Sequence, residues 1–306
     1  MDVKIRTENL TKIFGGAIEK KPVLALDSLN LDIKSGEVFA YLGQNGAGKT
    51  TTIKLLTRLI RPSKGKIIID GISNRSTEAL QKLGYLPEQP NLYGYLTGRE
   101  FLDFIGQLFR IEKSTRHKRV QELLNKVGLE KSADRKIRGY SRGMIQRLGF
   151  AQALINDPDI LILDEPLSNL DPIGRKDMRD IILELKEKGR TIFFSSHILS
   201  DAELVADRVG FISQGKLTKT GALDELVTDQ NAGSEITFTL DSDKQDKLKK
   251  LLEDSVSQGD KIMIREHDQK KLNTNIRQII DAGGTILSVV AQKRSLEDIF
   301  MDQVGR

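Results

Sequence analysis

The chain has 306 residues, of which 38% are hydrophobic and 30% charged, and it contains no cysteine. This length exceeds the range in which a single hydrophobic core usually keeps growing, so we expect one large and one small domain. The absence of cysteine excludes disulfides, thiolate metal sites and cysteine nucleophiles. The longest apolar runs, such as Ile286–Ala291, are too short to span a bilayer, and the first ten residues lack the apolar stretch of a secretion signal. The sequence therefore predicts neither secretion nor membrane insertion.

Positive charge is concentrated in the N-terminal part of the chain. The net charge is +5, with 36 basic and 27 acidic side chains in residues 1–220, but 12 basic and 16 acidic ones in residues 221–306. A basic domain could attract nucleic acid, nucleotide phosphates or an anionic membrane face. A solvated surface of mixed charge explains a surplus this small more simply.

Short strand-like segments alternate with helical ones through the first two-thirds of the chain. We expect strands at Val3–Leu10, Ala25–Ile33, Glu37–Leu42, Lys66–Asp70, Ile160–Leu163, Thr191–Ser195 and Val209–Ser213, and helices at Lys49–Leu59, Arg175–Lys188 and Leu199–Ala206. This alternation predicts an α/β domain with parallel strands and crossover helices.

Two regions depart from this rhythm. Residues from about 88 to 157 are predominantly helical, with helices expected at Gly98–Phe109, Thr115–Val127 and Arg142–Ile155, which predicts a helical insertion. The last part predicts strands at Ile236–Leu240, Lys261–Arg265 and Thr285–Val290, and helices at Lys244–Glu253 and Lys271–Ala282. We therefore divide the chain into residues 1–220 and a small α+β appendix, residues 221–306.

The segment Gly43–Thr50 fits the pattern of a glycine, four residues and then Gly-Lys-Ser/Thr, between a predicted strand and a predicted helix. Glycines let backbone N–H groups turn inward around phosphate oxygens, and the start of the helix adds further donors. Lys49 would neutralise the β and γ phosphates of a nucleotide, and the Thr50 hydroxyl would bind magnesium. The alternative is a glycine-rich turn that precedes a helix.

Acidic and imidazole side chains follow two other predicted strands. Asp164 and Glu165 come directly after the apolar run Ile160–Leu163, and His197 follows Thr191–Ser196. The carboxyl edge of a parallel sheet is where ligands bind, next to the phosphate loop if the strands are neighbours. Asp164 would hold magnesium through water, Glu165 would orient or deprotonate the attacking water, and His197 would contact the γ-phosphate or that water. Alone, such an acidic pair is more often a helix cap.

Residues 140–147, Tyr-Ser-Arg-Gly-Met-Ile-Gln-Arg, resemble the signature usually written Leu-Ser-Gly-Gly-Gln, with strict matches at Ser141 and Gly143. With the motifs above, residues from about 3 to 220 resemble the nucleotide-binding domain of the ABC superfamily, in the branch of drug, sodium and polysaccharide exporters with separate permeases. The resemblance implies a P-loop NTPase core with an antiparallel β subdomain and a helical insertion. It also implies an ATPase that uses ATP and Mg²⁺.

In this family the signature of one chain closes over the γ-phosphate held by another, so two chains would sandwich two ATP molecules. Ser141 and Gly143, at the start of a predicted helix, would supply that anion site, although a plain helix N-cap would look the same. The implied catalytic residues are Lys49, Glu165 and His197, and the implied metal ligands are Thr50, Asp164 and Glu88. The implied nucleotide-binding residues are Phe14, Gly43, Gln44, Asn45, Gly46, Ala47, Gly48, Lys49, Thr50, Thr51, Glu88, Ser141 and Gly143.

Several of these positions leave alternatives open. Phe14 resembles the aromatic residue that stacks on adenine, but a core phenylalanine at a strand end would look alike. Glu88 stands where the family has a magnesium-sensing glutamine, while Gln89 follows it, so either could act. Ser168–Asp171 resembles a loop that couples opposed sites, or Asp171 simply caps a helix. Pro90–Arg99 would face the permease, or pack within the helical insertion.

The sequence thus predicts the ATP-hydrolysing subunit of an ABC exporter, peripheral at the cytoplasmic membrane face, with a permease and a second ATP-binding subunit as partners and no nucleic acid. The alternative is a soluble ABC ATPase that acts on ribosomes or DNA. Such proteins usually carry two cassettes per chain or split the cassette with long coiled coils, and this sequence has one cassette and no sustained heptads. The C-terminal segment resembles an appendix common in the exporter branch, and neither its role nor the substrate follows from the sequence.

Overall fold

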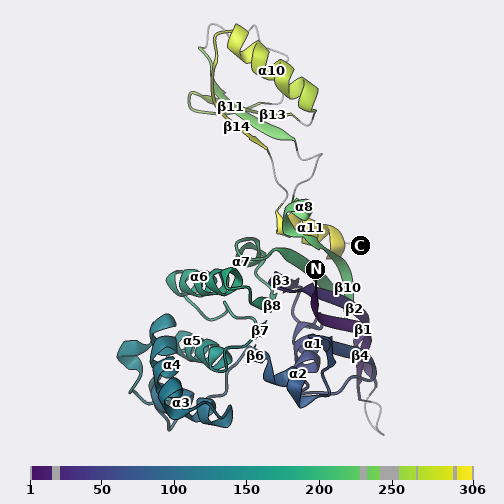
Figure 1. Ribbon diagram of the computed structural model, residues 1–306. Helices are drawn as coiled ribbons and strands as arrows, with labels where there is room; N and C mark the ends of the chain where they lie inside the picture. The colour runs from purple at the N-terminus through teal and green to yellow at the C-terminus, as the bar shows by residue number, and fades with distance from the viewer. Residues whose placement is uncertain are drawn as a thin grey trace. The chain divides into compact units, whose positions relative to one another are not determined.

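The structure, a computed structural model, describes residues 2–15, 21–227, 233–241, 255–266, 268–291 and 295–304. The chain forms two units, Met1–Leu223 and Asp224–Arg306. The first contains two sheets with their helices, and the second contains a third sheet with its own helix (Figure 1).

The larger sheet of the first unit has the strand order β10-β9-β3-β8-β7-β6. Its strands are β3 (Val38–Leu42), β6 (Leu83–Leu86), β7 (Ile160–Asp164), β8 (Thr191–Ser196), β9 (Arg208–Ser213) and β10 (Lys216–Ala222). Every residue of β3, β7 and β8 is buried, as their apolar runs predict for strands covered on both faces. Only β10 runs antiparallel to its neighbour, so the α/β prediction is confirmed.

The sheet order settles a point that the sequence left open. Strand β7, which ends in Asp164, does not pair with β3, because β8 lies between them. The carboxyl ends of β3, β8 and β7 nevertheless stand side by side. The loop after β3, His197 after β8 and Glu165 after β7 therefore meet along one edge of the sheet.

The smaller sheet is antiparallel and has the order β2-β1-β4-β5. It consists of β1 (Val3–Phe14), β2 (Val23–Lys34), β4 (Lys64–Ile69) and β5 (Ile72–Ser73). Its buried side, with Ile5, Leu31 and Ile67, belongs to one hydrophobic cluster with Phe39 and Tyr41 of β3. Strand β1 continues past the expected end at Leu10, because a bulge at Asn9 (φ +47°) interrupts the in-out alternation without ending the strand.

Helices connect and cover these strands. They are α1 (Lys49–Leu56), α2 (Thr77–Gln81), α3 (Gly98–Leu108), α4 (Lys113–Lys126), α5 (Arg142–Leu154), α6 (Pro172–Glu187) and α7 (Leu199–Glu203), with short 3-10 turns at Glu130–Ser132 and Ile137–Gly139. Helices α3, α4 and α5 gather away from the antiparallel sheet and form the expected helical insertion (Figure 1). Helix α1 stops before the expected Leu59, since Thr57 leaves the helical conformation and Arg58 turns left-handed at φ +58°.

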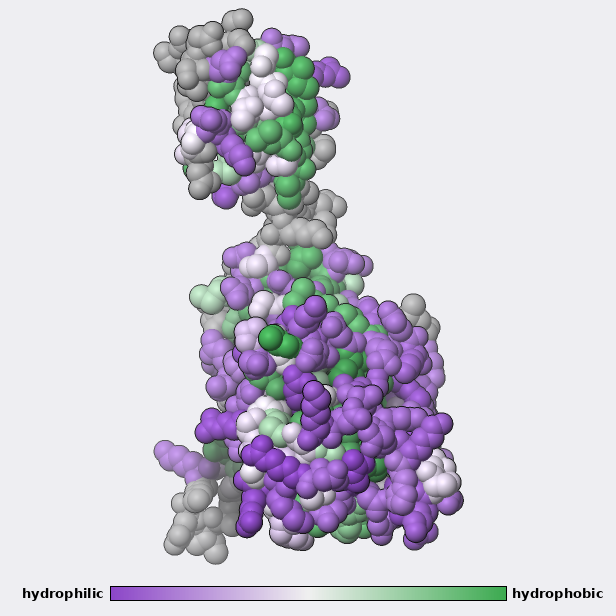
Figure 2. All heavy atoms as spheres, turned by 90° about the vertical axis from the view of Figure 1, so that its left-hand side faces the viewer, coloured by the Kyte–Doolittle hydropathy of each residue, from purple (hydrophilic) through white to green (hydrophobic). Residues whose placement is uncertain are grey.

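The second unit is a sheet packed on one helix. Strands β11 (Ser234–Thr239), β12 (Val256–Gln258), β13 (Lys261–Glu266) and β14 (Thr285–Ala291) pair in the order β12-β13-β11-β14, and α10 (Gln269–Asp281) packs on them through Leu272 and Ile279. Helices α8 (Leu223–Val227) and α11 (Leu296–Val304) flank this sheet in the sequence. The expected helix Lys244–Glu253 lies outside the described residues. A band of apolar side chains crosses this unit, whereas the visible face of the first unit is mostly hydrophilic (Figure 2).

Most elements missing from the sequence prediction are short, apart from β10 with seven residues and α11 with nine. Helix α2 has five residues and β6 has four, too few to establish a period. Strand β12 and helices α8 and α11 were also not predicted, because we recognised no hydrophobic periodicity in their sequences. Within the described residues, no helix is long and apolar enough to cross a membrane.

The centre of the larger sheet depends on Phe193. Its ring is fully buried and lies 6.0 Å from that of Phe39 and 5.3 Å from that of Tyr41, measured between centroids. Phe193→Ala should lower the free energy of unfolding by about 3–5 kcal/mol, because it removes these contacts and leaves a cavity. Urea unfolding of the full chain measures the change. Phe109→Ala, at a position 44% exposed, is the control and should shift stability by less than about 1 kcal/mol; equal shifts would contradict this account of the core.

Candidate active site

The loop between β3 and α1 can adopt its path only with glycine at two positions. A Cβ atom at Gly43 would lie 2.5 Å from the carbonyl oxygen of Ile212, and one at Gly48 would lie 2.9 Å from a methyl carbon of Leu26. Gly48 also has φ +115° and forms the left-handed N-cap of α1. The loop is thus pressed against β2 and β9. This leaves its backbone N–H groups and the start of α1 as the ready donors for an anion.

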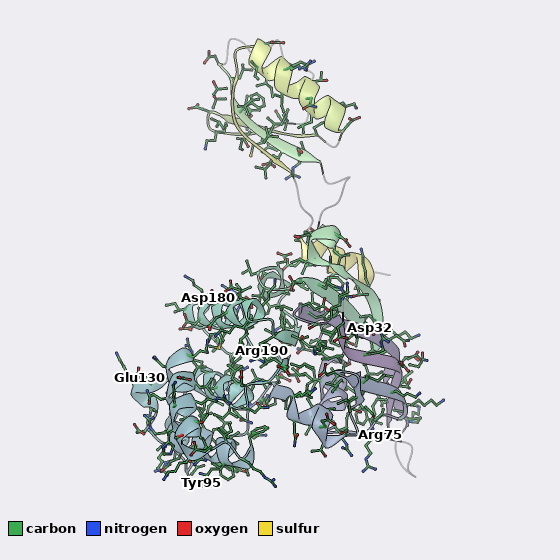
Figure 3. The ribbon with its side chains drawn as sticks, in the orientation of Figure 1. Asp32, Arg75, Tyr95, Glu130, Asp180 and Arg190 are labelled. Atoms are coloured by element: carbon green, nitrogen blue, oxygen red, sulfur yellow. The ribbon has the colours of Figure 1, made fainter. Side chains whose placement is uncertain are left out.

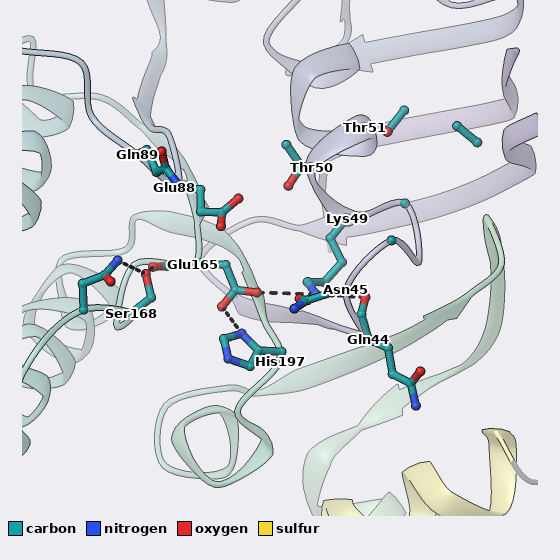
Figure 4. Close-up of a pocket in the computed structure, with 14 residues that line it drawn as sticks. Gln44, Asn45, Lys49, Thr50, Thr51, Glu88, Gln89, Glu165, Ser168 and His197 are labelled. Atoms are coloured by element: carbon teal, nitrogen blue, oxygen red, sulfur yellow. Dashed lines mark hydrogen bonds and ion pairs between the residues drawn. The ribbon is translucent and has the colours of Figure 1, made fainter. Parts of the chain in front are cut away.

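Lys49 lies across this loop and points toward the acidic edge of the sheet. Its Nζ donates to the carbonyl oxygens of Gly43, at 2.6 Å, and Gln44, at 3.3 Å, and it lies 3.4 Å from Oε1 of Glu165 (Figure 4). The side chain is only 6% exposed. A buried ammonium with one carboxylate and two carbonyl partners can exchange that carboxylate for a more highly charged phosphate.

Asp164 is buried at the end of β7 with one oxygen unsatisfied. Ser195 Oγ donates to its Oδ1 at 2.7 Å, and Thr50 Oγ1 lies 3.4 Å from the same atom. Oδ2 has no hydrogen-bond partner among the described residues. Burial raises the pKa of this carboxyl, and the negative charges of Glu88 and Glu165 act in the same direction. A divalent cation beside Thr50 would satisfy this oxygen and compensate its charge.

The donors present fit magnesium better than a metal held wholly by protein. The described residues contain no group of three His, Cys, Asp or Glu side chains that could hold a metal ion. Magnesium usually keeps several waters and binds through one or two carboxylates together with substrate phosphates. Asp164 and Thr50 are of the right type and number for such a site.

Glu165 is held between a cation and an imidazole. Its Oε2 lies 2.8 Å from Nδ1 of His197, and its Oε1 faces Lys49. The residue is 7% exposed, whereas the His197 side chain is 46% exposed. The carboxylate accepts a hydrogen bond from the imidazole N–H, so the other ring nitrogen is left for a ligand.

A pocket of about 510 Å³, in the size range of small-molecule sites, brings most of the predicted residues together. Ten of them line it: Gln44, Asn45, Gly46, Gly48, Lys49, Thr50, Thr51, Glu88, Glu165 and His197. Ala25, Gln89, Ser168 and Asn169 complete the lining (Figure 4). Gly43, Ala47 and Asp164 are buried and do not line the pocket.

Three predicted residues lie off this pocket. Phe14, at the end of β1, is 41% exposed, and Nζ of Lys12 lies 4.8 Å from its ring centroid. It is therefore not a core phenylalanine, and its ring is accessible. Ser141 is exposed at the N-cap of α5, where its Oγ accepts a hydrogen bond from the Met144 backbone at 3.2 Å. Gly143 is in the first turn of the same helix, so neither residue reaches the pocket of its own chain.

The sequence analysis missed two residues that contact the acidic edge. Ser195 bridges it, because its Oγ donates to Asp164 and accepts from the Glu165 backbone N–H at 3.0 Å. Gln146 of α5 donates to the carbonyl oxygens of Glu165 and Pro166. A serine inside an apolar strand was a usable signal for the first. The second lies within residues 140–147, the segment that resembles the family signature, but the pattern did not indicate its contact with Glu165.

Comparisons with known proteins show the family to which the chain belongs. The family described as ABC transporter matches residues 26–168. An uncharacterized ABC transporter ATP-binding protein of Nostoc sp. is 43% identical over 99% of this chain and 90% of that protein. The bacitracin transport ATP-binding protein BcrA of Bacillus licheniformis is 38% identical over 100% of this chain and 98% of its own. The dimeric post-hydrolysis structure of the ATP-binding cassette MJ0796, bound to ADP and Pi, matches with a TM-score of 0.67 and 27% identity over 72% of this chain and 98% of that one.

Ser195→Ala should destabilise the nucleotide-free protein by about 1–3 kcal/mol, because it leaves a buried carboxylate oxygen and a backbone N–H without their shared partner. Urea unfolding measures the loss. Ser35→Ala, on an exposed turn, is the matched control and should change stability by less than about 0.5 kcal/mol. Indistinguishable stabilities of the two variants would show that the bridge is dispensable.

Proposed function

This chain belongs to the ABC transporter ATP-binding proteins and is an ATP-hydrolysing subunit of such a transporter, and on that premise we propose that it powers export through a separate membrane permease. The observation that carries the ATP-hydrolysing part of the proposal is the convergence of Lys49, Glu165 and His197 on one pocket beside the phosphate loop. Whole-length similarity to a bacitracin transport protein supports transport. The exporter-like form of the segment around Ser141 supports the direction.

In the proposed site the phosphate loop and Lys49 bind the ATP phosphates. Lys49 exchanges its contact with Glu165 for the phosphates, whose charge is larger. Thr50 and the free Oδ2 of Asp164 would hold Mg²⁺, with Glu88 or Gln89 at the same pocket as the further contact. When bound, Mg²⁺ would neutralise charge on the phosphate oxygens. Phe14 offers an accessible ring for the adenine.

Glu165 and His197 would act on the attacking water. Once Lys49 turns to the phosphates, the Glu165 carboxylate is left as a base that one imidazole hydrogen bond orients. His197 would place its second nitrogen toward the γ-phosphate or the water. The low exposure of Glu165 keeps bulk solvent from competing for this carboxylate.

A second chain would complete each site. Ser141 and Gly143 are at the exposed start of a 13-residue helix, where free N–H groups favour an anion, yet they lie off their own chain's pocket. The dimer of the similar cassette MJ0796 supports pairing of two such chains. We infer that the Ser141 segment of each chain closes on the nucleotide held by the other.

The permease would dock on an aromatic surface of the helical insertion. Tyr93 and Tyr95 are 46% and 69% exposed, and the Tyr93 ring lies 5.8 Å from that of Tyr95 and 5.9 Å from that of Phe104. Tyr95 lies at the outer end of the helical group (Figure 3). Exposed apolar clusters of this kind mark interaction surfaces. With the permease as its anchor, the chain would be peripheral at the cytoplasmic face of the membrane.

Glu165→Gln should lower ATP turnover by about 10²- to 10⁴-fold while ATP still binds, because the amide keeps the shape of the carboxylate and loses the base. Turnover and bound nucleotide are measured on the same purified protein, and ATP-bound dimers should accumulate. Glu187→Gln, at an exposed position of α6, is the control and should retain full turnover. Undiminished hydrolysis in Glu165→Gln would make Glu165 a structural acid only.

The composite site predicts complementation. Neither Lys49→Ala nor Ser141→Arg chains alone should hydrolyse ATP, whereas their mixture should regain turnover. In the mixed dimer, the intact phosphate loop of the Ser141→Arg chain faces the intact Ser141 segment of the Lys49→Ala chain, which restores one site. Turnover and trapped nucleotide per dimer are the measurements. Mixed dimers that form but show neither would mean that Ser141 is an ordinary helix cap.

A further inference from the structure

The backbone of Glu165 is in a conformation that it would not adopt alone. Its φ is +50°, in the left-handed region, although the residue has a Cβ. A non-glycine residue there costs roughly 1–2 kcal/mol, so the surroundings must hold it. This turn sends the side chain from the end of β7 toward Lys49 and His197, and the direction of the carboxylate therefore depends on whatever fixes the turn.

Three side chains hold the peptide groups of this turn. The Glu165 N–H donates to Ser195 Oγ on β8, and its carbonyl oxygen accepts from Ser168 Oγ at 2.8 Å, within the same loop. Gln146 Nε2 donates to that carbonyl oxygen at 3.2 Å and to the carbonyl oxygen of Pro166 at 3.3 Å. Of the three, Gln146 alone comes from α5, the helix that Ser141 caps.

The chemistry at Gln146 is specific. Both of its partners are carbonyl oxygens, which can only accept, so the amide nitrogen must face them and a carboxylate could not replace it. The side chain is 2% exposed and does not line the pocket that contains Lys49. A change here therefore acts on the nucleotide indirectly, first of all through the turn of Glu165 and Pro166 whose carbonyl oxygens the amide holds.

We propose that Gln146 is a positioning residue that holds Glu165 in its left-handed conformation and so aims the carboxylate at the reacting water. The role rests on the proposed function, because it assumes that Glu165 acts on that water. In this proposal α5 has two roles. Its first residues contact the nucleotide bound to the partner chain, and its fifth residue, Gln146, positions Glu165 of its own chain.

The first test separates positioning from packing. Gln146→Met keeps the side-chain volume and removes the donor, and Gln146→Glu replaces the donor by an acceptor. Both should lower kcat for ATP about 10- to 100-fold while KM for ATP changes less than about twofold, because orientation is lost and binding is not. Gln152→Met, the same change at a half-buried position of the same helix, should leave kcat unchanged. An equal effect at both positions, or a rise in KM with unchanged kcat, would overturn the proposal.

The second test asks which chain's Glu165 the residue serves. The reference is the mixed dimer of a Ser141→Arg chain with a Lys49→Ala chain, whose single complete site uses Glu165 of the Ser141→Arg chain. Adding Gln146→Met to that chain should lower turnover about 10- to 100-fold, and adding it to the Lys49→Ala chain should change turnover less than about twofold. Equal losses in the two arrangements would overturn the proposal, since Gln146 would then support the Ser141 segment. If the reference dimer itself is inactive, the two-chain site fails, and the kcat and KM values of the unmixed variants decide the role of Gln146.

Discussion

The burial of three parallel strands on both faces is the constraint on which the site depends. Because β3, β8 and β7 have no solvent-exposed residue, charged side chains within them are found only at their carboxyl ends, and others follow just beyond. The chain places a glycine loop, His197 and the Asp164–Glu165 pair at those ends. Their order in the sheet then brings Lys49 and His197 to opposite oxygens of the same carboxylate. The packing and order of the strands thus fix where the loops begin, and this determines the geometry of the pocket.

In the absence of a ligand, this arrangement leaves buried charged groups poorly solvated. Asp164 has an unsatisfied oxygen and a pKa raised by burial, and Lys49 is almost inaccessible. Such groups destabilise the folded chain when they stand alone, and a cation or phosphate that binds them restores the balance. Ser195 lowers the cost of burying these groups, because its hydroxyl forms hydrogen bonds with both the Asp164 carboxylate and the Glu165 backbone N–H. The same buried charged groups that would bind a charged ligand therefore also lower the stability of the ligand-free protein.

Helix α5 connects the exposed Ser141 segment, which lies off the pocket, with the turn that carries Glu165. Its N-terminus is exposed and off the pocket, whereas its buried face reaches the turn that carries Glu165. In the proposed two-chain site, a helix that carries the Ser141 segment at its start and holds the turn of Glu165 from its buried face would link the two nucleotides physically. The second unit is a sheet packed on one side by α10, and it presents exposed apolar residues such as Val256 and Val290.

The sequence by itself determined the phosphate loop, the acidic pair, His197 and the class of the fold. These follow from local physics, since glycine spacing, β-branched runs and their polar ends act over a few residues. Only the tertiary structure decided that β8 separates β3 from β7, that Phe14 and Ser141 lie off the pocket, and that Ser195 and Gln146 fix Glu165. These features depend on residues far apart in the sequence that packing brings together, such as Gln146 and Glu165, which are 19 positions apart, and no local pattern encodes such contacts. The left-handed turn at Glu165 is the clearest case, because two of the three side chains that hold it come from α5 and β8, and only Ser168 lies in the same loop.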